Sequence, residues 1–251
     1  MILSIVQARM SSTRLPFKVM KEVLGKPLIG YVFERLAYSK RINKIILATS
    51  RSKENDPLAR YVKDLGFEVY RGSEEDVLER FYYAATGYKP QTVVRVTADT
   101  PLIDPKVCDR LIDFFLRETA DYACLGKTFA EGVDCEVFSY SALVKAYQNS
   151  NKKSEREHVT PYIYNHPHLF KKVTMENKTD DSRWRFTVDE QEDFEVVNAI
   201  MKALYEKDPI FSLEEIKEFL TAHPNIAKKN VQIIRNEGYL KSLKEDSMTK
   251  S

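Results

Sequence analysis

The chain has 251 residues, 43% of them hydrophobic and 30% charged, a composition typical of a globular protein with a substantial core. Its formal net charge is only +2, so we expect no general attraction to nucleic acid or to a membrane surface, and any anion site must be local. No apolar run approaches the roughly 20 residues of a membrane helix, and the N-terminus lacks the basic leader of a signal peptide, so we expect a cytoplasmic protein.

The first half of the chain alternates short β-branched runs with amphipathic segments. Strands are predicted at "ILSIV", "KIILAT", "FEVYR" and "TVVRVTAD". Helical spacing after each strand predicts helices at "PLIGYVFERLAYSK", "DPLARYVKDL", "EEDVLERFYYAA" and "PKVCDRLIDFFLRE". This alternation indicates parallel βαβ units, and therefore an α/β fold whose mostly parallel sheet is covered by helices on both faces.

The second half is less regular. Strands are predicted at "VDCEVFS", "LFKKVTM" and "RWRFTV", and helices at "SALVKAYQN", "SEREHVTPYIYNHP", "EQEDFEVVNAIMKALYEK" and "SLEEIKEFLTAHP". Pro161 should break the second of these helices, and Ser212 with Glu215 predicts a capping box for the last. We expect one domain over 1–240, with an irregular C-terminal elaboration and a disordered tail at 241–251. Its three widely spaced cysteines should be reduced.

A cationic loop, "QARMSSTRLPFK", follows the first predicted strand. It carries Arg9, Arg14 and Lys18, with Ser11 and Ser12 between them. Ligands of open α/β sheets bind at the carboxyl ends of the strands, and such side chains are the usual partners of phosphate oxygens. The loop is neither a Walker A motif nor a Gly-x-Gly dinucleotide motif. Its charge fits either a polyphosphate site or a solvated surface loop.

Two aspartates lie where they could complete such a site. Asp99, in "RVTADTPLID", ends the fourth predicted strand at the same edge of the sheet. A carboxylate facing a phosphate loop indicates a bridging Mg²⁺, although Asp99 also fits a turn before a proline. Asp189, in "RWRFTVDEQEDFE", either caps the following helix or shares the metal with Asp99, if its strand returns beside the fourth.

A family resemblance joins these motifs. "QARMSSTRLPFKVM", "RGSEEDVLERF", "RVTADTPLID", "GVDCEVFS", "SEREHVTPYI" and "RWRFTVDEQEDFE" occur in the order seen in the SpsF-like cytidylyltransferases, which are similar to the synthetases of CMP-octulosonate and CMP-sialate. The resemblance runs from residue 1 to about residue 200. It implies a three-layer α/β/α nucleotidyltransferase-like fold, CTP as co-substrate, Mg²⁺ and a homodimer. It further implies a nucleotide-binding half at 1–125, an acceptor-binding and dimerisation half at 126–205, and C-terminal helices at 206–240.

The resemblance also implies roles for residues at matched positions. Arg14, Lys18 and Asp99 are the expected catalytic residues, and Asp99 and Asp189 the expected metal ligands. Phe17 stands where the octulosonate enzymes have glycine, and "TAD" where they have Gln-Gly-Asp. Gly72 and Ser73 end a predicted strand at the active edge, where they could contact the base. The expected nucleotide-binding residues are Gln7, Ala8, Arg9, Ser11, Ser12, Arg14, Lys18, Gly72 and Ser73.

The implied reaction is transfer of CMP from CTP to an acidic sugar with release of pyrophosphate, in surface polysaccharide or glycoconjugate synthesis. For the acceptor, Asp134 and Glu136 share one face of a predicted strand, and Arg156 and His158 suit a sugar carboxylate or hydroxyl. Arg156 could instead lie on a solvated helical face, and His158 could be structural.

Three other functions remain open. A metal-dependent glycosyltransferase acting on nucleotide sugars would have a similar sheet, but would usually show Asp-x-Asp where "TADT" supplies one aspartate. A uridylyl- or adenylyltransferase would differ only in its nucleotide. A nucleotide-binding scaffold without activity is the non-enzymatic alternative.

Overall fold

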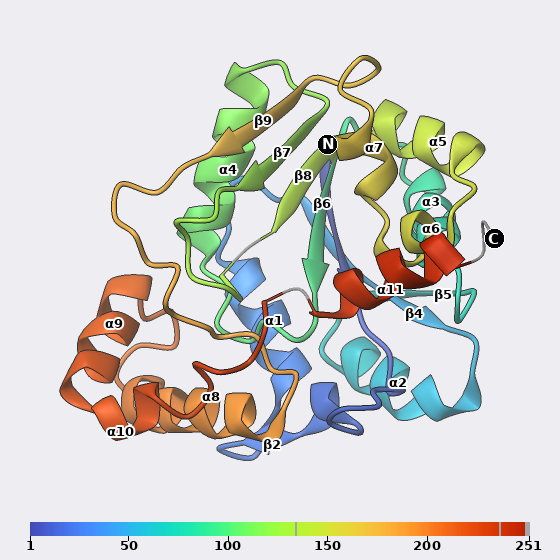
Figure 1. Cartoon of the computed structure of the whole chain (residues 1–251). Helices are drawn as coiled ribbons and strands as arrows, with labels where there is room; N and C mark the ends of the chain where they lie inside the picture. The colour runs from blue at the N-terminus through green and yellow to red at the C-terminus, as the bar shows by residue number, and fades with distance from the viewer. Residues whose placement is uncertain (134, 236, 249–251) are drawn as a thin grey trace.

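A seven-stranded sheet forms the centre of the protein, in the order β5-β4-β1-β6-β8-β7-β9 (Figure 1). The computed structural model describes residues 1–133, 135–235 and 237–248. Four parallel strands match the four runs predicted in the first half: β1 (Ile2–Gln7), β4 (Lys44–Ser50), β5 (Glu68–Gly72) and β6 (Thr92–Thr97). The prediction of a mostly parallel α/β sheet is therefore confirmed.

One strand of the main sheet runs against its neighbours. β8 (Glu136–Ser139) is antiparallel both to β6 and to β7 (Tyr122–Leu125), and β9 (Lys172–Met175) then pairs with β7 in parallel. In this register Glu136 lies opposite Arg95. The reversal brings the first residue of β8 to the sheet edge where β1, β6 and β7 end. A short hairpin of β2 (Glu22–Val23) and β3 (Lys26–Pro27) follows the first loop.

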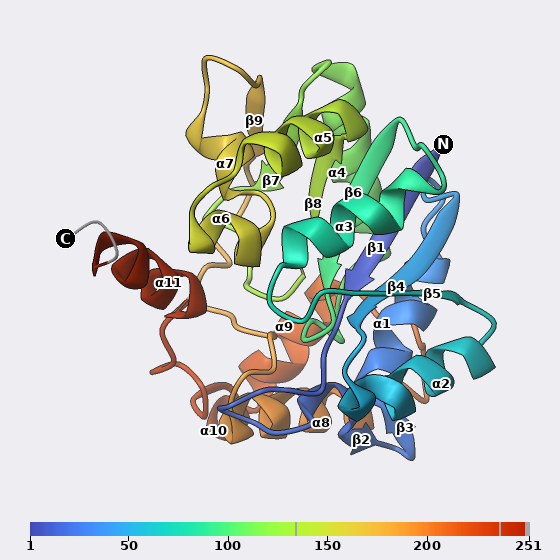
Figure 2. The same ribbon diagram turned by 90° about the vertical axis from the view of Figure 1, so that its right-hand side faces the viewer.

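Helices cover both faces of the sheet, which gives the predicted three layers (Figure 2). Successive residues of each strand point to opposite faces, so Leu3 and Ile5 pack on one side and Val6 on the other. On the Val6 side lie α1 (Leu28–Ala37), α2 (Asp56–Asp64) and α4 (Pro105–Arg117). On the other side lie α3 (Val77–Thr86), α5 (Tyr140–Asn149) and α7 (Pro161–Asn165). α6 (Lys153–His158) precedes the predicted break at Pro161.

The C-terminal elaboration is helical. α8 (Gln191–Leu204) and α9 (Leu213–Ala222) form a second core beside α1, and the short α10 (Pro224–Ala227) follows them. The predicted capping box of α9 is present between Ser212 and Glu215. No helix within the described ranges is long and apolar enough to cross a membrane.

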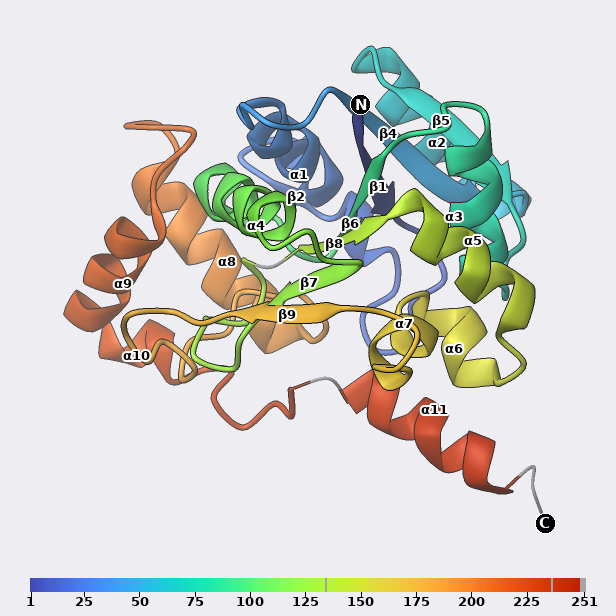
Figure 3. The ribbon, with the colours of Figure 1, turned by 90° about the horizontal axis from the view of Figure 1, so that it is seen from above.

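Two predictions about the second half are wrong. The tail predicted as disordered from residue 241 is helical as far as Met248, because α11 (Glu237–Met248) packs beside α6 (Figure 3). The run "RWRFTV" forms only an isolated bridge between Arg185 and Glu131. Its buried residues pack against α8 and donate their backbone hydrogen bonds to loops, so burial alone produced the strand-like pattern.

Candidate active site

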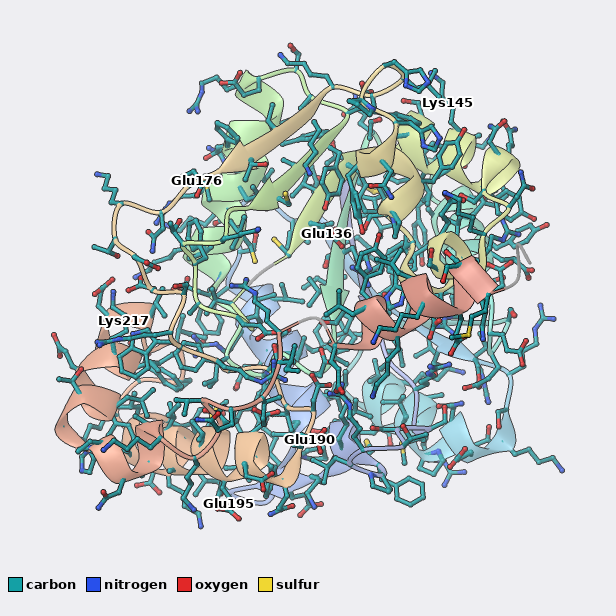
Figure 4. The ribbon with its side chains drawn as sticks, viewed as in Figure 1. Glu136, Lys145, Glu176, Glu190, Glu195 and Lys217 are labelled. Atoms are coloured by element: carbon teal, nitrogen blue, oxygen red, sulfur yellow. The ribbon has the colours of Figure 1, made fainter. Side chains whose placement is uncertain are left out.

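A cavity of about 1110 Å³ opens at the edge where β1, β6 and β7 end. The first loop forms one wall, β8 and α6 form another, and the beginning of α11 closes the side away from the sheet. Figure 4 shows Glu136 near the middle of the molecule and Glu190 below it, at the start of α8. The volume is large enough for a nucleotide together with a second small molecule.

Lys18 lies at the centre of the charged part of this cavity. Its ammonium donates to Asp99 Oδ2 at 2.9 Å and to Asp189 Oδ1 at 2.8 Å. Only 13% of the lysine side chain is exposed. Burial by itself lowers the pKa of Lys18, but the two carboxylates outweigh it and leave the pKa above its ordinary value. Lys18 is therefore a partly buried, charged group between two anions.

Asp189 belongs to the cavity and does not cap α8. Glu190 is the N-cap, and Asp193 accepts the backbone N–H groups of residues 189 and 190. The carboxylate of Asp189 also contacts Arg14 at 2.9 Å and Arg185 at 2.8 Å. Burial raises the pKa of Asp189, but the neighbouring cations, Lys18 foremost, lower it below its ordinary value. The capping alternative is thus excluded, and Asp189 stays ionised.

Arg185 is a site residue that the sequence analysis missed. Its guanidinium is only 7% exposed and pairs with Glu131 at 2.6 Å, Asp189 at 2.8 Å and Asp193 at 2.9 Å. Two of these carboxylates, Asp189 and Asp193, lie at the start of α8, and the third, Glu131, comes from a distant segment, so Arg185 ties the two segments together and fixes the orientation of Asp189. A signal was available, because an arginine inside a run predicted to be buried requires acidic partners.

The two aspartates form a donor set that fits a hard divalent cation. Asp99 and Asp189 both direct an oxygen at the same cation, the ammonium of Lys18, so they face one point in the cavity. No group of three or more His, Cys, Asp or Glu side chains able to hold a metal occurs among the residues that the structure describes. Proteins commonly bind Mg²⁺ through one or two carboxylates, while phosphate oxygens and water complete the coordination shell.

The first loop lines the cavity as predicted, with Gln7, Ala8, Arg9, Ser11, Ser12, Arg14 and Lys18 all on its wall. The buried amide of Asn55 anchors the loop by accepting from Met10 N at 2.8 Å. Glu74 accepts from Ser11 Oγ at 2.8 Å and lies 3.8 Å from the guanidinium of Arg9. Phe17, at the family's glycine position, has a left-handed backbone with φ of 57°, which is the conformation that favours glycine.

Gly72 and Ser73 do not line the cavity. Gly72 ends β5, an edge strand that β4 separates from β1, and Ser73 follows it. Ser73 instead fixes the start of α3, because its hydroxyl accepts from Asp76 N at 3.0 Å and its carbonyl accepts from Arg80 at 2.8 Å. Gly72 and Ser73 thus stand apart from the residues that line the cavity, and their contact with the base stays a prediction.

Glu136 lines the opposite wall of the cavity. It accepts from Arg95 and from the hydroxyl of Tyr122, and from Thr160 Oγ1 at 2.8 Å. Burial, with the charge of Glu136, raises the pKa of Tyr122 well above its ordinary value, so the phenol stays protonated. Asp134, predicted to share this wall, lies outside the described residues.

His158 reaches the cavity and Arg156 does not. The His158 ring lies 2.9 Å from Ser242 Oγ, and burial holds its pKa below the ordinary value, so the imidazole is neutral at pH 7. Arg156 pairs with Asp76 at 2.7 Å and donates to the carbonyl of Tyr147 at 2.9 Å. α6 therefore presents His158 to the cavity and turns Arg156 toward α3, so the structure does not bring Arg156 to the wall where His158 lies.

Comparison with known proteins accords with this geometry. The model of the family described as Cytidylyltransferase matches residues 3–240. The spore coat polysaccharide biosynthesis protein SpsF of Bacillus subtilis is 33% identical over 233 residues, which cover 90% of this chain and 96% of SpsF. The structure of a cytidylyltransferase from Leptospira borgpetersenii superposes with a TM-score of 0.86 at 32% identity, covering 94% of this chain and 99% of that one.

A more distant structure shows the fold alone. CMP:2-keto-3-deoxy-manno-octonic acid synthetase complexed with CTP has a TM-score of 0.63 at 15% identity, covering 80% of this chain and 98% of the synthetase. The nucleotidyltransferase-like architecture expected from the sequence is thereby confirmed. The family match over nearly the whole chain, together with the identity to SpsF, shows that the chain belongs to the cytidylyltransferase family of CTP-dependent nucleotidyltransferases.

Proposed function

We propose that the protein transfers CMP from CTP to an acidic sugar and releases pyrophosphate, in the synthesis of a surface polysaccharide or glycoconjugate. The observation that carries the proposal is the convergence of Lys18, Asp99 and Asp189 in a cavity that also receives Arg9 and Arg14. The relationship to SpsF, a spore coat polysaccharide biosynthesis protein, supports the proposed pathway.

The first loop binds the triphosphate in this proposal. Arg9, Arg14 and Lys18 offset its negative charge, and the hydroxyls of Ser11 and Ser12 donate to phosphate oxygens. The acceptor hydroxyl attacks the α-phosphorus in line, the bond to the β-phosphate oxygen breaks, and pyrophosphate leaves. Negative charge builds on the leaving group, so the fixed cations of the loop stabilise the transition state more than the ground state.

Asp99 and Asp189 would hold Mg²⁺, in a family whose members typically use a divalent metal. When bound, the ion supplies neutralisation of charge on the phosphate oxygens. Arg185 keeps the carboxylate of Asp189 turned toward the cavity through its own bond to that group. Lys18 holds the two carboxylates together when they have no other cation to share.

The acceptor lies against β8 and α6 in this proposal. Glu136, Thr160 and neutral His158 provide acceptors and donors for sugar hydroxyls on that wall. Arg156 takes no part, so positive charge for the sugar's carboxylate comes from another cation of the lining, such as Lys127 or Lys241. A homodimer remains a prediction from the family resemblance, to be tested by light scattering on the purified chain.

The test is release of pyrophosphate from CTP and Mg²⁺ across a panel of acidic sugars, including octulosonate and nonulosonate acids. We expect release with at least one acceptor, and much slower release when UTP or ATP replaces CTP. Transfer from UDP-sugars without pyrophosphate would favour the glycosyltransferase alternative. Binding of CTP without turnover on any acceptor would favour the scaffold.

A further inference from the structure

α11 lies apart from the sheet, beside α6 (Figure 3), and its beginning lines the cavity. Its first turns contribute Glu237, Gly238, Tyr239 and Lys241 to the lining. These residues lie more than 200 positions after the first loop in sequence, yet one of them, Glu237, contacts Arg14 of that loop directly. The helix is therefore part of the candidate site and not a separate appendage.

The two ends of α11 are held in different ways. The far end is fixed to α6, where Asp246 accepts from the backbone N–H of Ser154 at 3.1 Å and Glu245 pairs with Lys153 at 2.7 Å. Further along, Ser242 bonds to His158 at 2.9 Å. All of these partners lie on α6, outside the phosphate-binding loop.

The near end meets the first loop through the carboxylate of Glu237, while the ring of Tyr239 packs against His158 and Tyr164. The Oε2 of Glu237 lies 3.1 Å from a guanidinium nitrogen of Arg14, and its Oε1 lies 3.1 Å from the ammonium of Lys241. Arg14 also contacts Asp189 at 2.9 Å and Glu190 at 3.5 Å. Glu237 thus occupies, between two cations of the cavity, the position of an anionic ligand.

A triphosphate and Glu237 compete for the same cation. Phosphate oxygens that reach Arg14 must displace the Glu237 carboxylate or lie beside it, and like charges at such distances repel. Asp189 and Glu190 stand at the start of α8, which packs in the second core, whereas Glu237 lies on α11, which packs beside α6. The contact of Arg14 with Glu237 is therefore the one whose loss would leave α8 in place.

We propose that α11 is a strap latched to Arg14 by Glu237, and that the triphosphate of bound CTP releases this latch. The far end stays attached to α6, so release moves the first turns of the helix and with them Tyr239, whose ring packs against His158 on the proposed acceptor wall. Nucleotide binding thereby rearranges the acceptor wall. This inference rests on the proposed function only for the identity of the anion as the triphosphate of CTP. The latch between Arg14 and Glu237 does not depend on it.

The test is hydrogen–deuterium exchange of the full-length protein, followed on peptides from α11. In the wild type, CTP with Mg²⁺ should speed exchange in the first turns of α11, whereas CMP, which lacks the β- and γ-phosphates, should not. Glu237→Gln should speed the same exchange without any ligand, by about two- to fivefold, the range expected for one partly exposed ion pair. It should also tighten CTP binding, measured by calorimetry, and leave CMP binding unchanged.

Glu190→Gln is the matched control, because Glu190 also faces Arg14 but belongs to α8. It should tighten CTP binding in the same direction and leave the exchange of α11 unchanged. Slower exchange of α11 with CTP in the wild type, or equal exchange in unliganded wild type and Glu237→Gln, would overturn the proposal.

The two proposals can fail separately. If CTP does not bind at all, the proposed function is wrong, and the comparison of unliganded proteins still tests the latch. If CTP binds and pyrophosphate is released while α11 does not respond, only the strap is refuted.

Discussion

The ammonium of Lys18 lies between the carboxylates of Asp99 and Asp189, at 2.9 Å from one and 2.8 Å from the other. Each carboxylate would repel the other without a cation between them. In the proposed reaction the same pair would serve a second cation, a divalent metal ion, besides the lysine of the protein itself.

Lys18→Met should make the protein depend on a divalent cation for stability. Without metal, two partly buried carboxylates lose their shared partner, and we expect the free energy of unfolding to fall by about 1–3 kcal/mol. Adding Mg²⁺ should recover more of this loss in Lys18→Met than it adds to the wild type. Thermal unfolding at increasing Mg²⁺, without nucleotide, measures both effects, with exposed Lys40→Met as the control. Equal gains in all three proteins would contradict the shared site.

Asp99 and Asp104 lie close together in sequence, but we expect Asp99→Asn to impair catalysis and Asp104→Ala to impair stability by removing a helix cap. Asp104 is the N-cap of α4 and accepts from Lys106 N at 2.8 Å, so its removal should cost about 1 kcal/mol of stability and leave turnover unchanged. Asp99→Asn should lower pyrophosphate release by about 10²–10³, the cost of losing one charged contact to the transition state, with little effect on stability. Urea unfolding and steady-state rates of both variants check this, and the reverse pattern would make Asp99 a turn residue.

Arg156→Ala should weaken the fold and leave acceptor binding intact. The substitution removes the ion pair with Asp76 and the bond to the Tyr147 carbonyl, so we expect a loss of about 1–2 kcal/mol. The KM for the acceptor should not change, whereas His158→Ala should raise it. Exposed Arg110→Ala is the matched control for loss of an arginine. A selective rise in acceptor KM for Arg156→Ala would restore the original prediction for that residue.

His158 should make stability depend on pH in the weakly acidic range. Burial holds its pKa below the ordinary value of 6.5, so the folded protein resists protonation there. As the pH falls below 6.5 the unfolded chain takes up the proton first, and the stability contributed by neutral His158 is lost until the folded pKa is reached. The free energy of unfolding should therefore fall more steeply from pH 7.5 to 5.5 in the wild type than in His158→Gln. Parallel curves for the two proteins would contradict a depressed pKa.

Much of the fold could be predicted because the spacing of hydrophobic residues indicates which side of a strand or helix is buried. The four runs that became β1, β4, β5 and β6 each precede an amphipathic helix, and that alternation specifies parallel strands. The spacing of hydrophobic residues does not indicate strand direction, so nothing in "VDCEVFS" indicated that β8 is antiparallel to both β6 and β7. It also does not report hydrogen bonding, which is why buried "RWRFTV" was mistaken for a strand.

The site residues could be predicted where they cluster in sequence. They were harder to predict where tertiary packing decides which side of a helix faces the cavity. Arg9, Arg14 and Lys18 share one short loop, so they reach one cavity. His158 and Arg156 are two positions apart on a helix, and only the surroundings of α6 decide which of them faces the cavity. Arg185 pairs with Glu131 and Glu237 pairs with Arg14, both across distant segments, and one sequence carries no information on such pairings.

The contact of Arg14 with Glu237 joins residues 223 positions apart, and that of Lys18 with Asp189 spans 171. Closing such large loops is entropically costly until the intervening sheet and helices are in place. Assembly of this cavity should accordingly be among the last events as the polypeptide folds. Affinity for nucleotide would then be a sensitive reporter of complete maturation, lost in a molten or truncated chain that still retains most of its secondary structure.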